Sequence, residues 1–310
     1  MKICVIGTGG VGGYFGGRLA EAGYDVTFIA RGEHLQAIQN DGLEVKSVNG
    51  DFKIHPAKAT DDPDTTFDLI IIAVKVWQIY ALEPMIKKIT TTDSILLPIE
   101  NGIDAPSILQ QWMSPSQVLG GLCRIFSWID SPGVIRHDAY DPSITFGELD
   151  NRVTYRVKEI AAIFEKSKIK FHIAEDIDLE MWRKFLFITS TSALGALTRV
   201  PFGVFMKLPE TRQLLKDILS EMIDVGLAKG VKVTKSMVEE TMAFADKMPS
   251  DATTSLQRDI MEGKPSELEA QMGTVVRLAD KLHVKVDHCR LVLNALLPQE
   301  KVARGEFYLS

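Results

Sequence analysis

The chain has 310 residues, of which 45% are hydrophobic and 25% are charged, and its formal net charge is -6. This length allows a large core divided between two domains, and the composition is typical of a globular protein. The negative charge gives no reason to expect nucleic acid or an anionic membrane as a partner, and no segment reaches the roughly 18 apolar residues of a membrane span. We therefore expect a cytoplasmic protein with no nucleic-acid partner and no membrane partner.

The first predicted unit is a strand, a helix and a second strand. Residues 2–6 are apolar and predict a buried strand, residues 11–22 have apolar residues at helical spacing, and residues 24–30 predict a second buried strand. Gly23 is suited to end the helix in a left-handed conformation. The three elements together predict a βαβ unit.

The turn between the first strand and the helix has the glycine spacing G-x-G-x-x-G. This spacing allows a sharp turn and a close approach of the backbone to a pyrophosphate, and the helix N-terminus favours negative charge. A glycine-rich turn without a ligand is the alternative, but the βαβ context favours a dinucleotide. The residues expected to bind it are Gly7, Thr8, Gly9, Gly10, Val11 and Gly12.

Arg31 directly follows the second strand, about twenty residues after the glycine turn. An acidic residue at this place binds the ribose 2′-hydroxyl of NAD, whereas a guanidinium can hold a 2′-phosphate by charge and paired hydrogen bonds. We therefore expect NADP(H) as the cofactor. Glu33 leaves open an interaction with a 2′-hydroxyl, and Arg31 as a solvated surface residue is the other alternative.

Further strands alternate with helical segments as far as residue 174. The predicted strands are 67–74, 94–99, 117–125 and 168–174, with a helix at 152–167. Residues 126–149 carry aromatic and β-branched residues between proline and glycine turns, which predicts antiparallel strands at the sheet edge. From Glu175 onward the pattern is helical almost to the end.

This order predicts an α/β N-terminal Rossmann-type dinucleotide-binding domain, residues 1–174, and an all-α C-terminal domain, residues 175–310, which would hold the substrate in a cleft between the two domains. Residues 197–205 are apolar, as a homodimer surface would be, but packing inside the helical domain explains them equally well.

Cysteine and histidine residues give no sign of a disulfide framework or a metal site. Cys4, Cys123 and Cys289 are odd in number and far apart, which is typical of reduced thiols. The six histidines form no H-x-x-x-H or H-E-x-x-H pattern. We therefore expect structural histidines and no metal.

Three polar residues stand out as candidates for chemistry. Lys75 follows the strand at 67–74, and Asn101 follows the strand at 94–99, so both are expected at the ligand-binding edge of a parallel sheet. Lys184 lies beside an apolar segment in the helical half. For each residue taken alone, a solvated lysine or a turn asparagine is the simpler interpretation.

The chain as a whole resembles the ketopantoate reductase family, the 2-dehydropantoate 2-reductases. The similarity extends over residues 1 to about 300. The segments that carry it are "GTGGVGGYFGGRLAEAGYDVTFIARG", "AVKVWQ", "PIENGI", "PGVIRH", "WRKFLF" and "SLQRDIMEGKPSELEAQMGTVVRLA".

This resemblance implies an oxidoreductase that uses NADPH to reduce 2-dehydropantoate to (R)-pantoate, a step toward pantothenate and coenzyme A. It implies that Lys184 is the general acid and that Asn101 lies near the nicotinamide and the substrate. It further implies that Glu267 binds near the nicotinamide ribose, that Ser255 binds the substrate carboxylate, and that Lys75 lies by the cofactor.

The sequence departs from the family pattern on the helix of Lys184. The pantoate-forming enzymes carry asparagines four and eight residues after the lysine, where this chain has Ile188 and Ser192. Ser192 stays a candidate substrate ligand, but isoleucine cannot form hydrogen bonds. The alternatives are therefore an NADPH-dependent reductase of a different 2-oxo acid or ketone, and a non-catalytic NADP-binding regulator. A 3-hydroxyacid or glycerol phosphate dehydrogenase ranks last.

Overall fold

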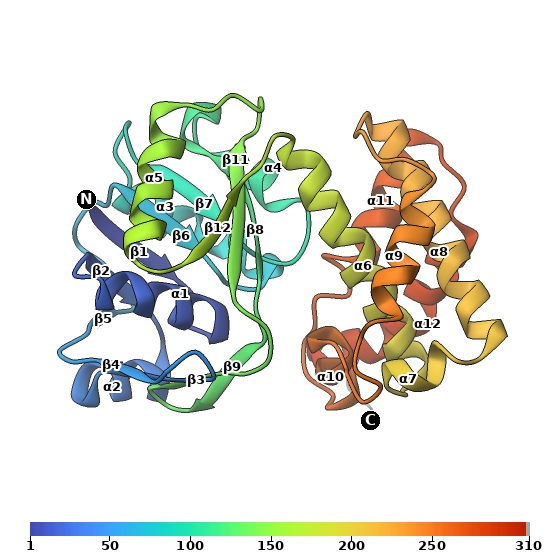
Figure 1. Cartoon of the computed structure of the whole chain (residues 1–310), viewed down its shortest axis with the longest axis horizontal. Coiled ribbons are helices and arrows are strands. Elements are labelled where there is room, and N and C mark those ends of the chain that lie inside the picture. Colours follow the sequence, from blue (N-terminus) through green and yellow to red (C-terminus); the bar gives the residue numbers. More distant parts are fainter. Residues whose placement is uncertain (308–310) are drawn as a thin grey trace. The chain divides into compact units, whose positions relative to one another are not determined.

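The computed structural model describes residues 1–307, which form two compact units, one ending at Asp178 and the other beginning at Leu179. The first unit combines strands and helices, and the second consists of helices, as the separate parts of Figure 1 show. This is the fold class expected from the sequence. Within residues 1–307, no helix combines the length and the apolar character needed to cross a membrane.

The first unit is built on a sheet of five parallel strands. β1 (Lys2–Ile6) lies between β2 (Asp25–Ile29) and β6 (Leu69–Ile72), while β5 (Lys58–Thr60) and β7 (Ile95–Pro98) form the edges. All neighbouring pairs run parallel. Because the strand order reverses at β1, ligands are expected to bind beyond the carboxyl end of this strand.

A second sheet contains four short strands from two distant parts of the sequence. Its order is β4 (Phe52–Ile54), β3 (Leu43–Ser47), β10 (Val134–His137) and β9 (Ser127–Ser131). β10 runs parallel to β3 and antiparallel to β9, so β9 and β10 form a hairpin. The hairpin is thereby joined to a segment about ninety residues earlier in the chain.

A third sheet contains β8 (Leu119–Arg124), β11 (Ser143–Glu148) and β12 (Lys170–Ile173), with β11 in the centre. β11 runs antiparallel to β8 and parallel to β12. A single parallel bridge between Leu96 and Val118 connects β7 to the segment before β8. The expectation that residues 126–149 extend the edge of the parallel sheet was therefore wrong, because these strands belong to the second and third sheets.

Helix α1 (Gly10–Glu21) packs between the first two sheets and has glycines facing both of them. Gly12 and Gly16 face β1 and β2, and Gly13 and Gly17 face the strands of the second sheet. A Cβ on Gly13 would lie 2.6 Å from a side-chain atom of β10, and one on Gly16 would lie 2.8 Å from a side-chain atom of β2. Most glycines of the opening segment are thus needed for close helix packing.

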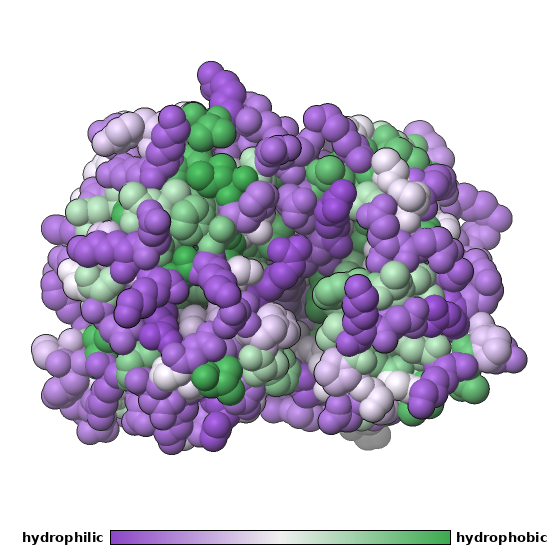
Figure 2. Space-filling model, viewed as in Figure 1, coloured by the Kyte–Doolittle hydropathy of each residue, from purple (hydrophilic) through white to green (hydrophobic). Residues whose placement is uncertain are grey.

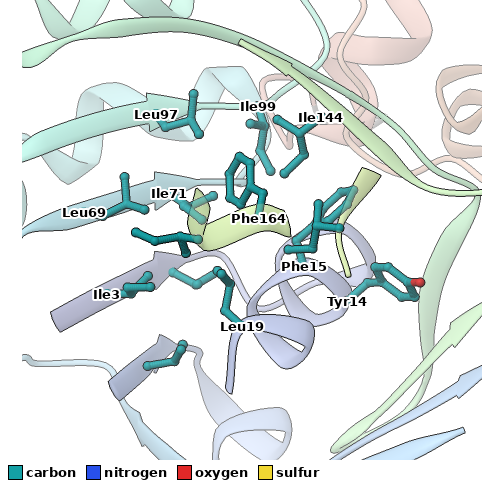
Figure 3. Close-up of a cluster of buried hydrophobic side chains, with 14 of the residues drawn as sticks. Ile3, Tyr14, Phe15, Leu19, Leu69, Ile71, Leu97, Ile99, Ile144 and Phe164 are labelled. Atoms are coloured by element: carbon teal, nitrogen blue, oxygen red, sulfur yellow. The ribbon is translucent and has the colours of Figure 1, made fainter. Parts of the chain in front are cut away.

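The core of the first unit joins these layers (Figure 3). Ile3, Leu69 and Leu97 come from the parallel sheet, Phe15 from α1, and Phe164 from α5 (Tyr155–Lys166). Phe15 and Phe164 are completely buried. The remaining helical elements of this unit are α2 (Gly32–Asp41), η1 (Val76–Leu82), α3 (Glu83–Ile89), α4 (Ala105–Leu109) and η2 (Pro115–Gln117).

The second unit is an assembly of helices around α8, which contacts α9, α11 and α12. Its helices are α6 (Ile177–Thr198, which begins in the last residues of the first unit), α7 (Phe202–Phe205), α8 (Pro209–Lys229), α9 (Met237–Ala245), α10 (Ser255–Met261), α11 (Met272–Leu282) and α12 (Asp287–Ala303). Trp182 of α6 is buried against Gly226 of α8, where a Cβ would lie 3.1 Å from the indole ring. On the face displayed in Figure 2, hydrophilic residues predominate and hydrophobic residues form only small patches.

Candidate active site

The glycine loop between β1 and α1 is fixed to the carboxyl end of β2. The backbone N–H groups of Gly7 and Thr8 donate to the carbonyl of Ile29 at 3.3 and 3.2 Å, and the Thr8 hydroxyl donates to the same carbonyl at 3.0 Å. Gly7 has φ of +94°, a conformation that side chains with a Cβ rarely adopt. These hydrogen bonds and the backbone of Gly7 give the loop a defined shape.

Gly9 and Gly12 differ in their surroundings, and the difference tests whether the loop fits a dinucleotide. A Cβ on Gly12 would lie 2.2 Å from the carbonyl oxygen of Gly7, so this glycine permits close packing of α1 against the loop. A Cβ on Gly9 would have no atom within 4 Å. The space above Gly9 is open where this motif brings a pyrophosphate to the backbone, and the first N–H groups of α1 have no intrahelical partner. The loop fits the group.

Arg31 lies where the sequence predicted it, directly after β2 and at the start of α2. Its backbone is extended, with φ of -139° and ψ of 161°, and its side chain is exposed. Glu33, in the first turn of α2, is also exposed. The exposed guanidinium at the end of β2 is available to an anionic group bound beside the neighbouring glycine loop.

Lys75 and Asn101 follow β6 and β7, so the parallel sheet brings both to the edge that carries the glycine loop. Both residues are half-buried. The backbone N–H of Lys75 donates to the side-chain oxygen of Gln78 at 3.1 Å, which fixes the start of η1. Gly102, with φ of +133°, turns the chain directly after Asn101. The strand order β2, β1, β6, β7 thus aligns Arg31, the glycine loop, Lys75 and Asn101 along one edge.

Helix α6 of the second unit carries Lys184, Ile188 and Ser192 at intervals of one helical turn, on one face. Lys184 and Ile188 are half-buried, whereas Ser192 is completely buried. The hydroxyl of Ser192 has no hydrogen-bond partner among residues 1–307, and the same is true of the nearby Thr189. This face of α6 therefore holds buried hydroxyl groups that a ligand or a water molecule could satisfy.

Ser255 is the first residue of α10, and the preceding Thr254 accepts a hydrogen bond from the Gln257 N–H at 3.2 Å. Gln257 in turn donates to the carbonyl of Val200 at 3.0 Å, and its side chain packs against Gly195 of α6. These contacts attach the start of α10 to the C-terminal half of α6. Ser255 itself is half-buried.

Glu267 is buried and lies in the segment before α11. The neighbouring Ser266 is held by the buried carboxylate of Glu300, which accepts from the Ser266 N–H at 3.1 Å and also from its hydroxyl. Arg304 forms an ion pair with Glu300 at 2.6 Å and donates to the Ser266 carbonyl at 2.8 Å. The segment that carries Glu267 is therefore fixed from α12.

The predicted residues fall into two sets. Residues 7–12, Arg31, Lys75 and Asn101 share one sheet edge in the first unit, whereas Lys184, Ser192, Ser255 and Glu267 lie in the second unit. Sequence analysis did not single out His34, Gln257 or Glu300. Only His34 offered a signal, because it follows Arg31 within one helical turn.

The three cysteines are buried and form no disulfide bond within residues 1–307. Cys4, Cys123 and Cys289 are buried free thiols, and burial raises the pKa of Cys4 and Cys289 well above the usual range. Among residues 1–307, no group of three or more His, Cys, Asp or Glu residues is arranged to hold a metal ion.

Comparison with known protein families identifies both halves of the chain. Residues 3–151 match the family model described as "Ketopantoate reductase PanE/ApbA", and residues 176–300 match the model described as "Ketopantoate reductase PanE/ApbA C terminal". The chain belongs to the ketopantoate reductase family. This confirms the resemblance seen in the sequence, and with it an oxidoreductase acting on CH–OH groups. Members of this family bind NADPH, in agreement with the expected cofactor.

Individual relatives cover almost the whole chain. A protein described as "Uncharacterized oxidoreductase YkpB" from Bacillus subtilis (strain 168) is 30% identical over 91% of this chain and 93% of its own length. A 2-dehydropantoate 2-reductase from Nostoc is 27% identical over 98% of this chain and 95% of its own. The crystal structure of a PanE/ApbA family ketopantoate reductase from Ralstonia eutropha JMP134, 25% identical, superposes with a TM-score of 0.90 and covers 98% of this chain and 100% of that chain.

Proposed function

We propose that this protein is an NADPH-dependent reductase of a small 2-oxo acid, with 2-dehydropantoate as the first candidate substrate and (R)-pantoate as the product. The observation that carries the proposal is the open space above Gly9, which follows the central strand β1, next to the strand β2 that leads to Arg31. Gly12 provides the close contact with the helix, whereas the open space leaves the backbone of Gly9 accessible to a pyrophosphate.

The residues proposed to hold the dinucleotide lie along the edge of the parallel sheet. The N–H groups of residues 9–12, at the start of α1, would hold the pyrophosphate, and Arg31 would hold the 2′-phosphate. Lys75, Asn101 and Glu267 contact the nicotinamide half, as the family resemblance implies. When bound, the dinucleotide supplies the hydride that reduces the ketone carbon.

Lys184 is proposed as the general acid. Hydride addition leaves negative charge on the ketone oxygen, so a nearby ammonium group stabilises this charge and then donates a proton from Nζ. Asn101 orients the ketone through its amide, and Ser255 and Ser192 donate hydrogen bonds to the substrate carboxylate. The buried Ser192 hydroxyl, which has no partner among the described residues, supports this role.

A second candidate substrate is a different 2-oxo acid or ketone. Ile188 is half-buried on the same face of α6 as Lys184, and its apolar side chain cannot bind a substrate hydroxyl. A pocket that lacks a hydrogen-bonding group discriminates poorly in favour of a hydroxylated substrate. This observation favours a substrate that is apolar where ketopantoate carries its hydroxyl.

The proposed activity is tested by following NADPH oxidation at 340 nm with ketopantoate and with unsubstituted branched 2-oxo acids. Lys184→Ala is expected to lower kcat by about 10²- to 10⁴-fold with each accepted substrate, because the developing charge loses its proton donor. The matched control is Lys229→Ala, which changes an exposed lysine at the end of α8. Equal activity of Lys184→Ala and the unaltered protein would remove the assignment, and NADPH binding without turnover of any substrate would favour the regulator.

Ile188→Asn separates the two candidate substrates. If ketopantoate is the natural substrate, the native pocket already suits it and the substitution lowers kcat/KM. If the pocket has diverged, the new amide raises kcat/KM for ketopantoate by about tenfold or more. Ile188→Leu, which keeps the apolar character and the volume, is the control. A gain for ketopantoate in the asparagine variant alone would overturn the first candidate.

A further inference from the structure

The imidazole of His34 connects two distant backbone segments of the first unit. Its Nε2 lies 2.7 Å from the carbonyl oxygen of Thr8, and its Nδ1 lies 3.0 Å from the backbone nitrogen of Gly133. His34 is in the first turn of α2 and is half-buried. Both contacts are made to backbone atoms, so no side-chain pattern elsewhere in the sequence indicates them.

The two contacts require opposite roles of the two ring nitrogens. A carbonyl oxygen can only accept, so Nε2 must carry a proton and donate to Thr8. A backbone N–H can only donate, so Nδ1 must be unprotonated and accept from Gly133. Only the neutral Nε2–H tautomer satisfies both. A charged imidazolium would place two N–H groups against each other at Gly133.

His34 joins the glycine loop itself, at Thr8, to the β9–β10 hairpin, at Gly133. Thr8 is held on its other side by the carbonyl of Ile29, so its peptide is bound from β2 and from α2 together. Gly133 forms the turn of the β9–β10 hairpin. The same hairpin packs against Gly10, where a Cβ would lie 2.5 Å from the carbonyl oxygen of Ser127.

We propose that neutral His34 is a positioning residue for dinucleotide binding, which locks the glycine loop to the β9–β10 hairpin, and that protonation of the ring releases this lock and weakens binding. The inference rests on the proposed function, because it assigns the loop to a dinucleotide. His34 itself touches only the protein, so it acts through the position of Thr8 and of the hairpin.

The environment of the ring favours the neutral form. Burial lowers the pKa of His34 below its ordinary value of 6.5, and the hydrogen bond to the Thr8 carbonyl offsets part of this effect. The lock is therefore complete above pH 6.5 and is lost as the pH falls through the lower pKa of the folded protein.

Charged side chains occur on several elements of this unit, whereas residues 7–13 of the loop have none. On β5, which packs against α2, Lys58 pairs with Asp25 of β2 at 2.7 Å. Arg31 and Glu33 are on α2. The hairpin carries Asp130 and Arg136, whose side chains lie 3.6 Å apart. On β3, Glu44 and Lys46 lie 4.0 Å apart. Burial and the Thr8 carbonyl, rather than these charges, shift the pKa of His34, so the release is attributed to the ring itself.

The first test needs no cofactor. Nitrogen-15 NMR of the histidine rings in the ligand-free protein at pH 8 distinguishes the two neutral tautomers, with His34 assigned by its absence in His34→Gln. The expected result is a protonated Nε2 and an unprotonated Nδ1. A protonated Nδ1, or rapid exchange between the two tautomers, would contradict the proposed pair of hydrogen bonds.

The second test measures the dissociation constants of NADP⁺ and NAD⁺ by calorimetry between pH 8 and pH 5.5. His34→Gln can still donate to Thr8 and accept from Gly133 but does not titrate, so it is expected to bind within about twofold of the unaltered protein at pH 8 and to lose the weakening in acid. His34→Leu removes both hydrogen bonds and is expected to raise the dissociation constant by about tenfold at every pH. The control is His172→Gln, which alters an exposed histidine on β12.

Comparing NADP⁺ with NAD⁺ separates the protonation of the His34 ring from that of the 2′-phosphate, which itself titrates near pH 6. Weakening in acid that occurs with both dinucleotides and disappears in His34→Gln supports the inference. An identical pH profile in the unaltered protein and in His34→Gln would overturn it. If the unaltered protein binds neither dinucleotide at pH 8, the proposed function fails, and the tautomer measurement alone then decides whether the lock exists.

Discussion

Arg31 connects two elements, since it ends the extended backbone after β2 and precedes the first residue of α2. Its side chain is exposed, so a ligand can reach the guanidinium without rearrangement of the protein. The guanidinium can bind a phosphate through two parallel hydrogen bonds. A single residue of this kind can decide between two cofactors that differ only in the 2′-phosphate. It adds binding free energy for the phosphorylated form, whereas with the unphosphorylated form the guanidinium stays in water and adds none.

Arg31→Ala is therefore expected to raise the dissociation constant of NADPH by about ten- to hundredfold while changing that of NADH by less than about threefold. The loss corresponds to charge-assisted hydrogen bonds that only the 2′-phosphate can accept. Binding titrations with both reduced dinucleotides measure it. Arg152→Ala, which breaks an exposed ion pair with Asp150 at 2.6 Å, is the control. Equal weakening of both dinucleotides would assign Arg31 to another part of the cofactor.

Glycine has two different roles in the segment formed by β1, residues 7–9 and α1. Some glycines permit α1 to approach two sheets, and others shape the loop or leave it open. Sequence reasoning could predict the turn and a bound dinucleotide from the spacing of Gly7, Gly9 and Gly12, and NADP(H) from Arg31, but it could not separate the two roles of glycine. The separation depends on which atoms lie beside each glycine, and many of those atoms belong to distant strands.

Substitution of Gly12 and Gly9 by alanine is expected to separate packing from binding. Gly12→Ala places a Cβ 2.2 Å from a backbone oxygen, so it should lower the free energy of unfolding of the first unit by about 1–3 kcal/mol. Gly9→Ala has free space and an allowed backbone, with φ of -82°, so it should leave stability unchanged and weaken dinucleotide binding. Denaturant unfolding and NADPH titration of both variants measure the two effects. Unimpaired binding by Gly9→Ala would contradict the proposed position of the pyrophosphate.

The strands of the first unit differed in how well the sequence predicted them. The strands at residues 2–6, 24–30, 67–74 and 94–99 are apolar throughout, so their sequences alone indicated buried parallel strands, and β1, β2, β6 and β7 lie there. β3, β4 and β5 were missed because they have three to five residues and are only partly buried. β3 is paired with a strand that the chain reaches much later. Such pairing cannot be inferred from a local pattern.

At the scale of the whole molecule, the candidate residues are distributed between two units, the first with most of the residues proposed to hold the dinucleotide and the second with the proposed acid. Family membership is established for both units, and the resemblance in the sequence predicted it because several separate segments matched in order. Ser255 and Glu267 could be predicted only through the resemblance, because a single serine or glutamate gives no local signal of a ligand. His34 was outside any motif, since its partners are two backbone atoms at residues 8 and 133.

The parallel pairing of β3 with β10 also has a consequence for synthesis on the ribosome. Glu44 pairs with Val134, so the sheet that covers one side of α1 cannot be completed until the hairpin has left the exit tunnel. At roughly 5–20 residues per second, this leaves the glycine-lined helix without that cover for about 5 to 20 seconds. During this interval the first helix lacks the contacts that β9 and β10 make with it in the folded unit.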